Sequence, residues 1–229
     1  AWSRPDHTSA LGAVFSWGRQ PDRFKRYPEA GRIELPDPRP YQGLSLEESL
    51  DRRRSRRAYR DEPLAQTELS RLLHAASGLT DPARGYRAAP SAGALYPLET
   101  YVAVHNVTDI EPGLYHYAVT DHALEQLRTG DLRTQFIVAG IGQEMLGQAQ
   151  VCFVLSAIFQ RTRWKYRERT YRYVLLEAGH VGQNLYLAAT SMGLGACAVG
   201  AFLDDKLNDL LAVDGEEEAA IYLISIGRV

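Results

Sequence analysis

The chain has 229 residues, of which 45% are hydrophobic, and a formal net charge of −2 at pH 7. A chain of this length can bury a substantial core and fits one domain, or one domain with an appended arm. The near-balanced charge gives no electrostatic reason to expect nucleic acid or an anionic membrane surface as a partner.

The two cysteines and the N-terminus indicate a reducing, cytoplasmic setting. Cys152 and Cys197 both lie in apolar runs, which is typical of buried thiols and not of a disulfide framework. The first six residues contain no apolar signal core. We therefore expect a cytoplasmic protein.

Residues 1–44 contain six of the 11 prolines and little hydrophobic periodicity. Because proline fixes the backbone and removes a hydrogen-bond donor, such a segment is disfavoured inside helices and sheets. We predict an extended proline-rich arm that wraps a neighbour, with residues 33–40 as its stiffest part. Residues 45–229 are expected to form the folded domain.

From residue 45 onward, helical and extended patterns alternate without a regular βαβ period. Ser45 and Glu48 form a capping-box pattern that starts a helix reaching about Arg54. Further predicted helices are 68–77, 131–141 and an apolar helix ending at Gly193, and predicted strands are 99–106, 113–119, 124–127, 151–159, 196–202 and 219–226. The strands 113–119 and 124–127 are expected to pair through a turn at 120–122, and residues 80–97 to form a loop. The pattern favours an α+β fold around one mixed sheet.

The stretch from Ala178 to Leu203 contains no charged residue. A membrane span is disfavoured because His180 and its polar neighbours would need partners in hydrocarbon. A helix buried in protein on most sides explains the stretch better, and we expect His180 to be buried and hydrogen-bonded. A domain of this size has little reason to surround one helix unless a second subunit covers part of it. We therefore predict a dimer, with a ligand near the glycine-rich exit of the helix.

The run from Arg52 to Arg57 places five arginines around Ser55, just after a helix end. One interpretation is a solvated basic face. The other is a phosphate site, because guanidinium groups match phosphate oxygens two at a time.

Three further motifs are weaker. Residues 89–97 are small and could let the backbone approach a flat ligand, or form an ordinary turn. Residues 193–200 fail as a dinucleotide fingerprint, because Ala198 replaces the third glycine and a helix precedes them. Glu177 and His180 have the spacing of di-iron helices, but this motif occurs once, so we expect no metal site.

Lys165 and Tyr166 lie in a basic, aromatic segment, 161–169. Both can act as acid or base when their surroundings shift the pKa. The nearby arginines would favour a tyrosinate or a neutral lysine. The alternative is a solvated, charged helix face.

Several motifs together resemble a known family. Residues 53–64 resemble the N-terminal flavin motif of the nitroreductase superfamily. Other segments are similar to the SagB-type dehydrogenases, which are the azoline oxidases of thiazole and oxazole biosynthesis. The matching segments are 24–27, 33–36, 90–99 and 171–184. The resemblance covers about residues 24 to 229.

The resemblance implies a nitroreductase-like α+β fold, with a mixed sheet flanked by helices, in an intertwined homodimer. Residues 45–229 would bind FMN at two interface sites. The phosphate and ribityl chain would be held by Arg53, Arg54, Ser55, Arg57 and Arg228. The isoalloxazine would be lined by Pro90, Ser91, Gly93 and Ala94, with Val199 and Gly200 passing nearby. Ala94 replaces an asparagine that many nitroreductases carry, so one side-chain contact is absent.

Lys165 and Tyr166 match a pair thought to serve catalysis in azoline dehydrogenases. The implied reaction oxidises a thiazoline or oxazoline, on a peptide or a carrier-bound intermediate, to the azole, with a cyclodehydratase or a nonribosomal synthetase as partner. Which of the two residues is the base stays open. Alternatives are an NAD(P)H-dependent nitro- or ene-reductase and a flavin-free scaffold protein.

Overall fold

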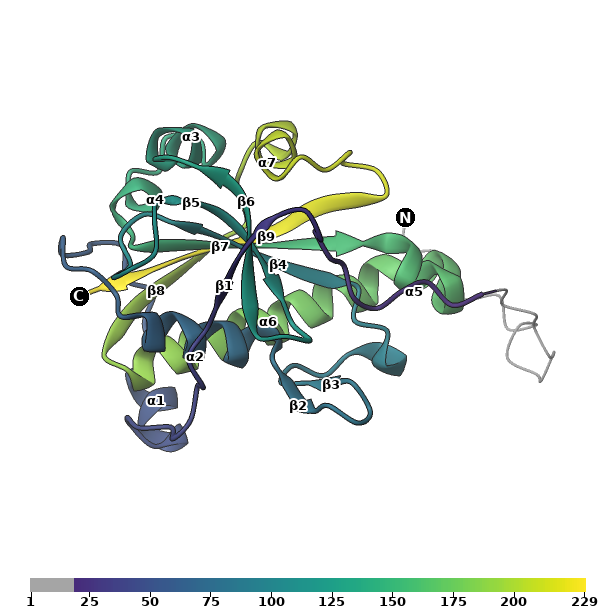
Figure 1. The fold of residues 1–229 in the computed structure, drawn as a ribbon, viewed down its shortest axis with the longest axis horizontal. Coiled ribbons are helices and arrows are strands. Elements are labelled where there is room, and N and C mark those ends of the chain that lie inside the picture. The colour runs from purple at the N-terminus through teal and green to yellow at the C-terminus, as the bar shows by residue number, and fades with distance from the viewer. Residues whose placement is uncertain (1–18) are drawn as a thin grey trace.

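The computed structural model describes residues 19–229, and the remainder of the predicted arm, residues 1–18, lies outside this range. A seven-stranded sheet runs through the molecule in the order β1-β6-β5-β4-β7-β9-β8 (Figure 1). Its strands are β1 (Gly31–Glu34), β4 (Leu98–Val104), β5 (Gly113–Ala118), β6 (Ala123–Thr129), β7 (Val151–Ile158), β8 (Leu194–Val199) and β9 (Glu218–Arg228).

Neighbouring strands of this sheet pair antiparallel. A parallel bridge between Ser55 and Ala196 adds a short parallel contact beside β8, which makes the sheet mixed. The predicted hairpin is confirmed, because β5 and β6 pair up to Ala118 and Ala123 around the turn.

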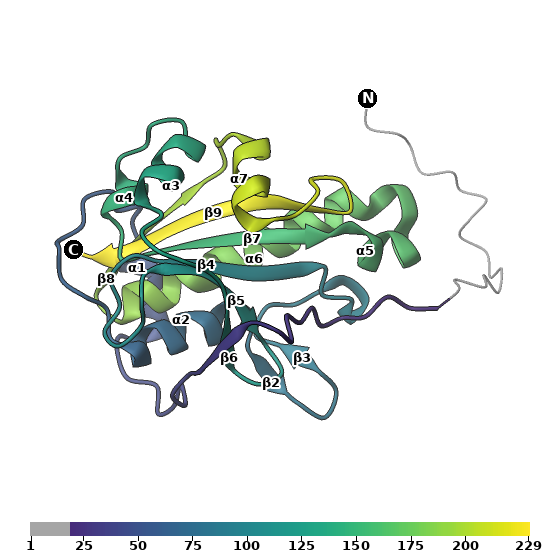
Figure 2. The ribbon, with the colours of Figure 1, turned by 45° about the horizontal axis from the view of Figure 1, so that its top comes forward.

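Helices cover both faces of the sheet (Figures 1 and 2). One face carries α1 (Leu46–Arg52), α2 (Gln66–Ser77) and α6 (Thr170–Ser191), and the other carries α3 (Arg133–Ala139), α4 (Met145–Gln148) and α7 (Asp204–Leu211). The helix α5 (Phe159–Tyr166) continues directly from β7. The sheet separates two hydrophobic cores. Val102 and Val104 of β4 pack in the core beneath α2 and α6, whereas Tyr101 and Ala103 pack in the core beneath α3 and α7. This alternation follows from the period of two along a strand.

Sequence patterns located most elements but missed the short ones. The capping box at Ser45 and Glu48 is confirmed. Residues 80–97, predicted as a loop, instead contain the hairpin of β2 (Leu79–Asp81) and β3 (Tyr86–Arg87) and the turn Ala92–Ala94. The helix α7 was not predicted, because its start, Leu203, offers no side-chain cap.

The described part of the arm packs on its own chain. Residues 31–34 form β1 and pair with β6. The backbone N–H groups of Lys25 and Tyr27 donate to Glu99 and Glu125. Residues 31–34 thus lie along the sheet of the same subunit, and residues 41–44 contact α2 and α6. Whether the arm also wraps a neighbouring subunit stays a prediction.

The helix α6 has one buried and one bare face. Val174, Val181 and Leu185 are buried against the sheet. Tyr171, Leu175 and Leu176 are 65%, 58% and 55% exposed. His180 also lies on this exposed face of the single subunit, so its predicted burial would require the second subunit and stays a prediction. Among the helices of residues 19–229, none is long and apolar enough to cross a membrane.

A buried histidine links two carboxylates inside the sheet. The Nδ1 of His116 lies 2.7 Å from Glu125 Oε2 and its Nε2 lies 2.9 Å from Glu99 Oε2. Burial alone would lower the pKa of His116, but hydrogen bonds to Glu125 and Glu99 outweigh it and raise that pKa above its usual value. The imidazolium thus compensates two buried anions.

We predict that His116→Ala lowers the free energy of unfolding by about 3–5 kcal/mol near pH 6, because it leaves buried Glu125 without its cation and Glu99 with Arg161 alone. Since the folded-state pKa of His116 is raised, the charge contribution is complete below about pH 6.5 and is lost as pH rises through the raised value. Urea titrations at low and high pH measure the difference.

His105→Ala is the matched control, because burial lowers the pKa of His105 to about 4 and keeps this histidine neutral. Its loss of stability should be constant above about pH 7.5, where the imidazole is neutral in both the folded and the unfolded chain. If His116→Ala behaves the same way, the imidazolium has no such role.

Candidate functional site

The arginine run follows α1 and lies along the edge strand β8. The N–H of Arg56 donates to the carbonyl of Ala196 over 2.9 Å, so the segment satisfies edge groups that β8 would otherwise expose. Gly195 permits this approach, since a Cβ there would lie 2.8 Å from the Cβ of Arg56. The sequence thus places its guanidinium groups at one edge of the sheet.

Ser55 and Arg53 converge on Tyr186 of α6. The hydroxyls of Ser55 and Tyr186 lie 3.0 Å apart, and the Arg53 guanidinium carbon is 5.3 Å from the Tyr186 ring centroid. The Tyr186 hydroxyl also accepts the N–H of Ala198 over 2.7 Å. Val199 is buried and Gly200 exposed just beyond. The predicted phosphate residues and this strand end therefore share one edge.

A cavity of about 620 Å³ opens beside the run, and its lining is Ser55, Arg56, Arg57, Ala58, Tyr59, Arg60 and Val229. Arg54 lies outside that lining and donates from Nη1 to the carbonyls of Asp51 and Arg53. The exposed cations and the Ser55 hydroxyl have the chemistry of an anion site.

Arg228 is engaged elsewhere. Its Nη1 and Nη2 each lie 2.7 Å from a carboxylate oxygen of Glu68 in α2. It also donates to the carbonyl of Pro63. The contact of Arg228 with a phosphate stays a prediction. For that contact, the Arg228 guanidinium would have to leave Glu68 or bind both groups.

The turn at residues 90–94 faces Lys165 and Tyr166. Gly93 has φ +66° and is exposed, and a Cβ placed on it would lie 3.0 Å from Tyr166 Oη and 3.1 Å from Lys165 Nζ. The following Ala94 also has positive φ, +52°. A glycine here lets the amine and the phenol lie directly against the backbone of the turn. The structure therefore brings together two motifs separated by 72 positions in the sequence.

The environment of Tyr166 differs from the sequence-based expectation. Burial, and then the neighbouring Tyr173 hydroxyl, raises the pKa of Tyr166 above its usual value. The expectation that arginines favour a tyrosinate was wrong. Arg163, Arg167 and Arg169 are exposed, where solvent screens them, and Arg161 is bound to Glu99. Tyr166 is therefore a neutral phenol at neutral pH.

Sequence reasoning missed three buried charged residues beneath the turn. Arg161 is only 3% exposed, pairs with Glu99 over 2.6 Å and donates to the Tyr96 carbonyl. Arg87 and Glu177 are also buried. Arg161 had been grouped with a solvated helix face, although buried Phe159 and Thr162 flank it. Its position directly after the apolar strand 151–158 was the available signal.

Glu177 and His180 do not form a ligand pair, because one faces the core and the other solvent. Within residues 19–229, no group of three or more potential metal ligands gathers.

The two halves of the predicted site meet different parts of α6. The arginine run adjoins α1 and β8, whereas the 90–94 turn meets α5 (Figures 1 and 2). Ser55 contacts Tyr186, and Tyr166 packs on Tyr173. These two positions are 13 residues apart on α6, which corresponds to a rise of about 20 Å.

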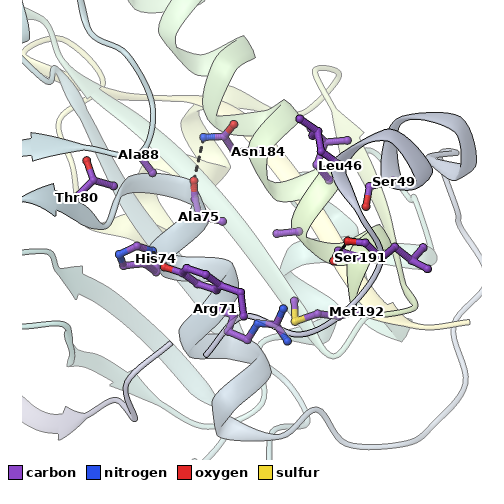
Figure 3. A pocket seen from close by; sticks show the side chains of 14 residues that line it. Leu46, Ser49, Arg71, His74, Ala75, Thr80, Ala88, Asn184, Ser191 and Met192 are labelled. Carbon is purple, nitrogen blue, oxygen red and sulfur yellow. Dashed lines mark hydrogen bonds between the residues drawn. The ribbon is translucent and has the colours of Figure 1, made fainter. Parts of the chain in front are cut away.

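A second cavity, of about 450 Å³, lies between α1, α2 and α6 (Figure 3). Asn184 donates to the Ala75 carbonyl over 3.0 Å and ties α6 to α2 at its wall. None of the predicted site residues lines it.

Comparison with known proteins gives the family. The model described as "Nitroreductase family" matches residues 50–228. The chain is 40% identical over 196 residues to "Putative nitroreductase MJ1384" of Methanocaldococcus jannaschii, covering 86% of this chain and 96% of that protein. It is 30% identical to the microcin B17-processing protein McbC of Escherichia coli, covering 70% of this chain and 61% of McbC. The match to McbC confirms the resemblance found in the sequence.

Solved structures agree with the fold. A "putative nitroreductase" of Ralstonia eutropha superposes with a TM-score of 0.76 at 31% identity, covering 93% of this chain and 95% of that one. The E. coli microcin synthetase McbBCD complex, with truncated pro-MccB17 bound, contains a chain that superposes with a TM-score of 0.67 at 27% identity, covering 86% and 78%. The fold, the matched residues and these relatives together show that the chain belongs to the nitroreductase family.

Proposed function

We propose that this chain is an FMN-dependent dehydrogenase that oxidises a thiazoline or oxazoline ring to the azole. The observation that carries the proposal is the close approach of Lys165 Nζ and Tyr166 Oη to the backbone of Gly93. A redox cofactor lying on this turn would have an amine and a phenol beside its reactive face. The relation to McbC supports the substrate class.

The described residues fit an FMN cofactor. Ser55 and Arg57 offer hydroxyl and charged donors at a surface cavity, and Arg53 lies over the ring of Tyr186, whose hydroxyl is 3.0 Å from that of Ser55. These groups suit a phosphate monoester. The turn at Gly93 is exposed and built of small residues, so its backbone is accessible to a flat ring. When bound, FMN supplies an acceptor for a hydride and its two electrons.

A homodimer would complete the site. The arginine run of one copy and the 90–94 turn of another would meet if the bare faces of α6 packed together. Tyr171, Leu175 and Leu176 give this face its apolar character, and burial of such side chains contributes about 1.5–3 kcal/mol each.

Lys165 and Tyr166 would handle the proton that the substrate ring loses. Aromatisation removes a hydride from one ring carbon and a proton from its neighbour. The raised pKa of Tyr166 makes its hydroxyl a hydrogen-bond donor to the substrate. The single variants of Lys165 and Tyr166 decide which of the two accepts the proton, and the turn would hold the ring in reach of both.

The likeness to McbC, and to a chain of the McbBCD complex with its pro-peptide, supports a peptide substrate and partner enzymes such as a cyclodehydratase. A carrier-bound intermediate of a nonribosomal synthetase would present the same ring chemistry.

A second candidate is an NAD(P)H-dependent nitroreductase. The 40% identity to "Putative nitroreductase MJ1384", over 96% of its length, favours it. Anaerobic mixing with NADPH separates the candidates, because a reductase bleaches its flavin quickly and an azoline dehydrogenase slowly. A protein that stays colourless with added FMN would contradict both candidates and favour a scaffold role.

We predict that Lys165→Ala and Tyr166→Phe keep FMN bound but lower azoline turnover by about 10²–10⁴-fold, the usual contribution of a positioned acid or base. Mass spectrometry of the substrate, which loses two hydrogens, measures turnover. Lys206→Ala, an exposed lysine of α7, should retain full activity. Full activity in both site variants would remove this pair from catalysis.

We predict that Arg53→Ala weakens FMN binding by about 10–150-fold, because a charge-assisted hydrogen bond contributes about 1.5–3 kcal/mol. Quenching of flavin fluorescence gives the Kd. Arg52→Ala is the control, since Arg52 is exposed and paired with Glu48. Equal effects of the two substitutions would mean that only general positive charge matters.

We predict that Leu176→Arg produces monomers and releases FMN, because a charge on the bare face of α6 opposes its burial in a dimer. Sedimentation velocity and the absorption spectrum report the two effects. Val138→Arg, on exposed α3 of the opposite sheet face, should change neither. A flavin-loaded Leu176→Arg monomer would exclude an interface site.

A further inference from the structure

Arg161 binds three segments of the chain at once. It lies in the first turn of α5, and only 3% of it is exposed. Its Nε donates to the carbonyl of Asp22 over 2.7 Å. Its Nη1 lies 3.0 Å from the carbonyl oxygen of Tyr96 and 2.6 Å from Glu99 Oε1. One guanidinium group therefore joins the arm, the end of the 90–96 turn and the strand β4 to α5.

The buried carboxylate of Glu99 fixes this guanidinium group. A charge taken out of water is costly unless it is paired and hydrogen-bonded. Burial alone would raise the pKa of Glu99, but the hydrogen bond to His116 and the charge of Arg161 lower that pKa to about 2. Glu99 is therefore an anion at neutral pH. Because guanidinium is planar, pairing with Glu99 also sets the directions of its other N–H groups.

The carbonyl that Arg161 binds belongs to a strained segment. Tyr96 has φ +48° and Ala94 has φ +52°, a region that is unfavourable for residues other than glycine. Their N–H groups donate to the hydroxyl and the carbonyl of Ser91 over 2.9 and 3.0 Å. Those two bonds lie inside the turn, whereas the Arg161 contact ties the turn to α5. Strained backbone persists where surrounding contacts hold it in this way.

The arm contacts the same turn. Arg23 Nη1 lies 3.4 Å from the carbonyl oxygen of Ala94. The backbone of the arm is held next to this contact, because Arg161 binds the carbonyl of Asp22 and Arg87 binds that of Arg23 over 2.7 Å each. Arg161 therefore holds the turn directly, at its end, and also through the arm residue that reaches Ala94.

We propose that Arg161 is a positioning residue, which fixes the 90–96 turn to α5 and so sets Gly93 against the pair Lys165 and Tyr166. That pair follows Arg161 on the same helix, and it approaches the backbone of Gly93. The proposal rests on the proposed function only in giving the pair a chemical role.

Two variants test the role. Arg161→Lys keeps a cation for Glu99 but replaces the planar fork by a single nitrogen, which cannot hold the carboxylate and both carbonyls together. The double variant Glu99→Gln with Arg161→Met removes both charges of the buried pair. Since no uncompensated charge is left in this pair, the double variant should fold even if Arg161→Lys does not.

Hydrogen exchange of the Ala94 and Tyr96 amides gives a readout that is independent of activity. Both amides bond inside the turn, so their protection reports whether the turn stays closed. We expect exchange about tenfold faster than in the parent in both Arg161 variants, the scale of a lost hydrogen bond. Amides of the β8–β9 ladder should not change.

Turnover gives the second readout. A misplaced reacting group can slow chemistry by about 10²-fold, so we expect kcat for an azoline substrate to fall by about 10–100-fold in Arg161→Lys. The Kd for FMN should change less than in Arg53→Ala, because the proposed phosphate residues are untouched.

His116→Ala is the matched control. It removes the other cationic partner of Glu99 and is predicted to destabilise the fold, but it leaves the contacts of Arg161 with Asp22 and Tyr96 in place. This variant should keep the exchange rates of the turn and the kcat of the parent.

The outcomes separate the two proposals. A parent that neither binds FMN nor oxidises an azoline, with exchange of the turn accelerated in the Arg161 variants, overturns the proposed function and leaves the positioning of the turn. Parental exchange rates in the Arg161 variants overturn the positioning role, and so does fast exchange combined with full turnover. Equal effects in His116→Ala also overturn it, because they would follow from lower global stability alone.

Discussion

The helix α6 is the constraint on which the rest of the structure depends. Its inner face, with Val174, Val181 and Leu185, is held by the sheet and cannot rotate without losing that burial. Once this face is set, Glu177 must point inward under the 90–97 segment, and Tyr186 must meet Ser55 at the far end. One helix thus orients both halves of the candidate site, and its outer face, with Tyr171, Leu175 and Leu176, stays exposed in the single subunit.

The bare face gives the single subunit an incomplete appearance. In this nitroreductase-family chain the cationic donors adjoin the C-terminal part of α6, and the glycine turn lies beside Lys165 and Tyr166 before its N-terminal part. A two-fold pairing of this face is isologous, and such a pairing would complete two equivalent sites at once. The proposed homodimer therefore follows from where the residues lie, and not only from the family.

Buried charge is the second theme of the structure. Arg87, Arg161, Glu99 and Glu177 lie beneath one strained turn, and His116 continues the network into the sheet. Arg161 also donates to the carbonyl of Asp22, and Arg87 to that of Arg23. The arm, the turn and α5 are consequently tied together by polar contacts, which have stricter geometry than apolar packing.

The sequence by itself determined the features that neighbouring residues encode. Local patterns predicted the capping box at Ser45, the hairpin around residues 119–122 and the apolar strand before Phe159. Each of these is formed by residues that are close together in the sequence. The family motifs also identified Lys165 with Tyr166 and the turn around Gly93 as separate pieces. Only the tertiary structure brought those pieces within contact distance, buried Arg161 and Glu177, exposed His180 and placed Arg228 on Glu68. These features depend on which residues face one another across α6 and the sheet. Burial and charge pairing between distant segments cannot be predicted from a local sequence pattern.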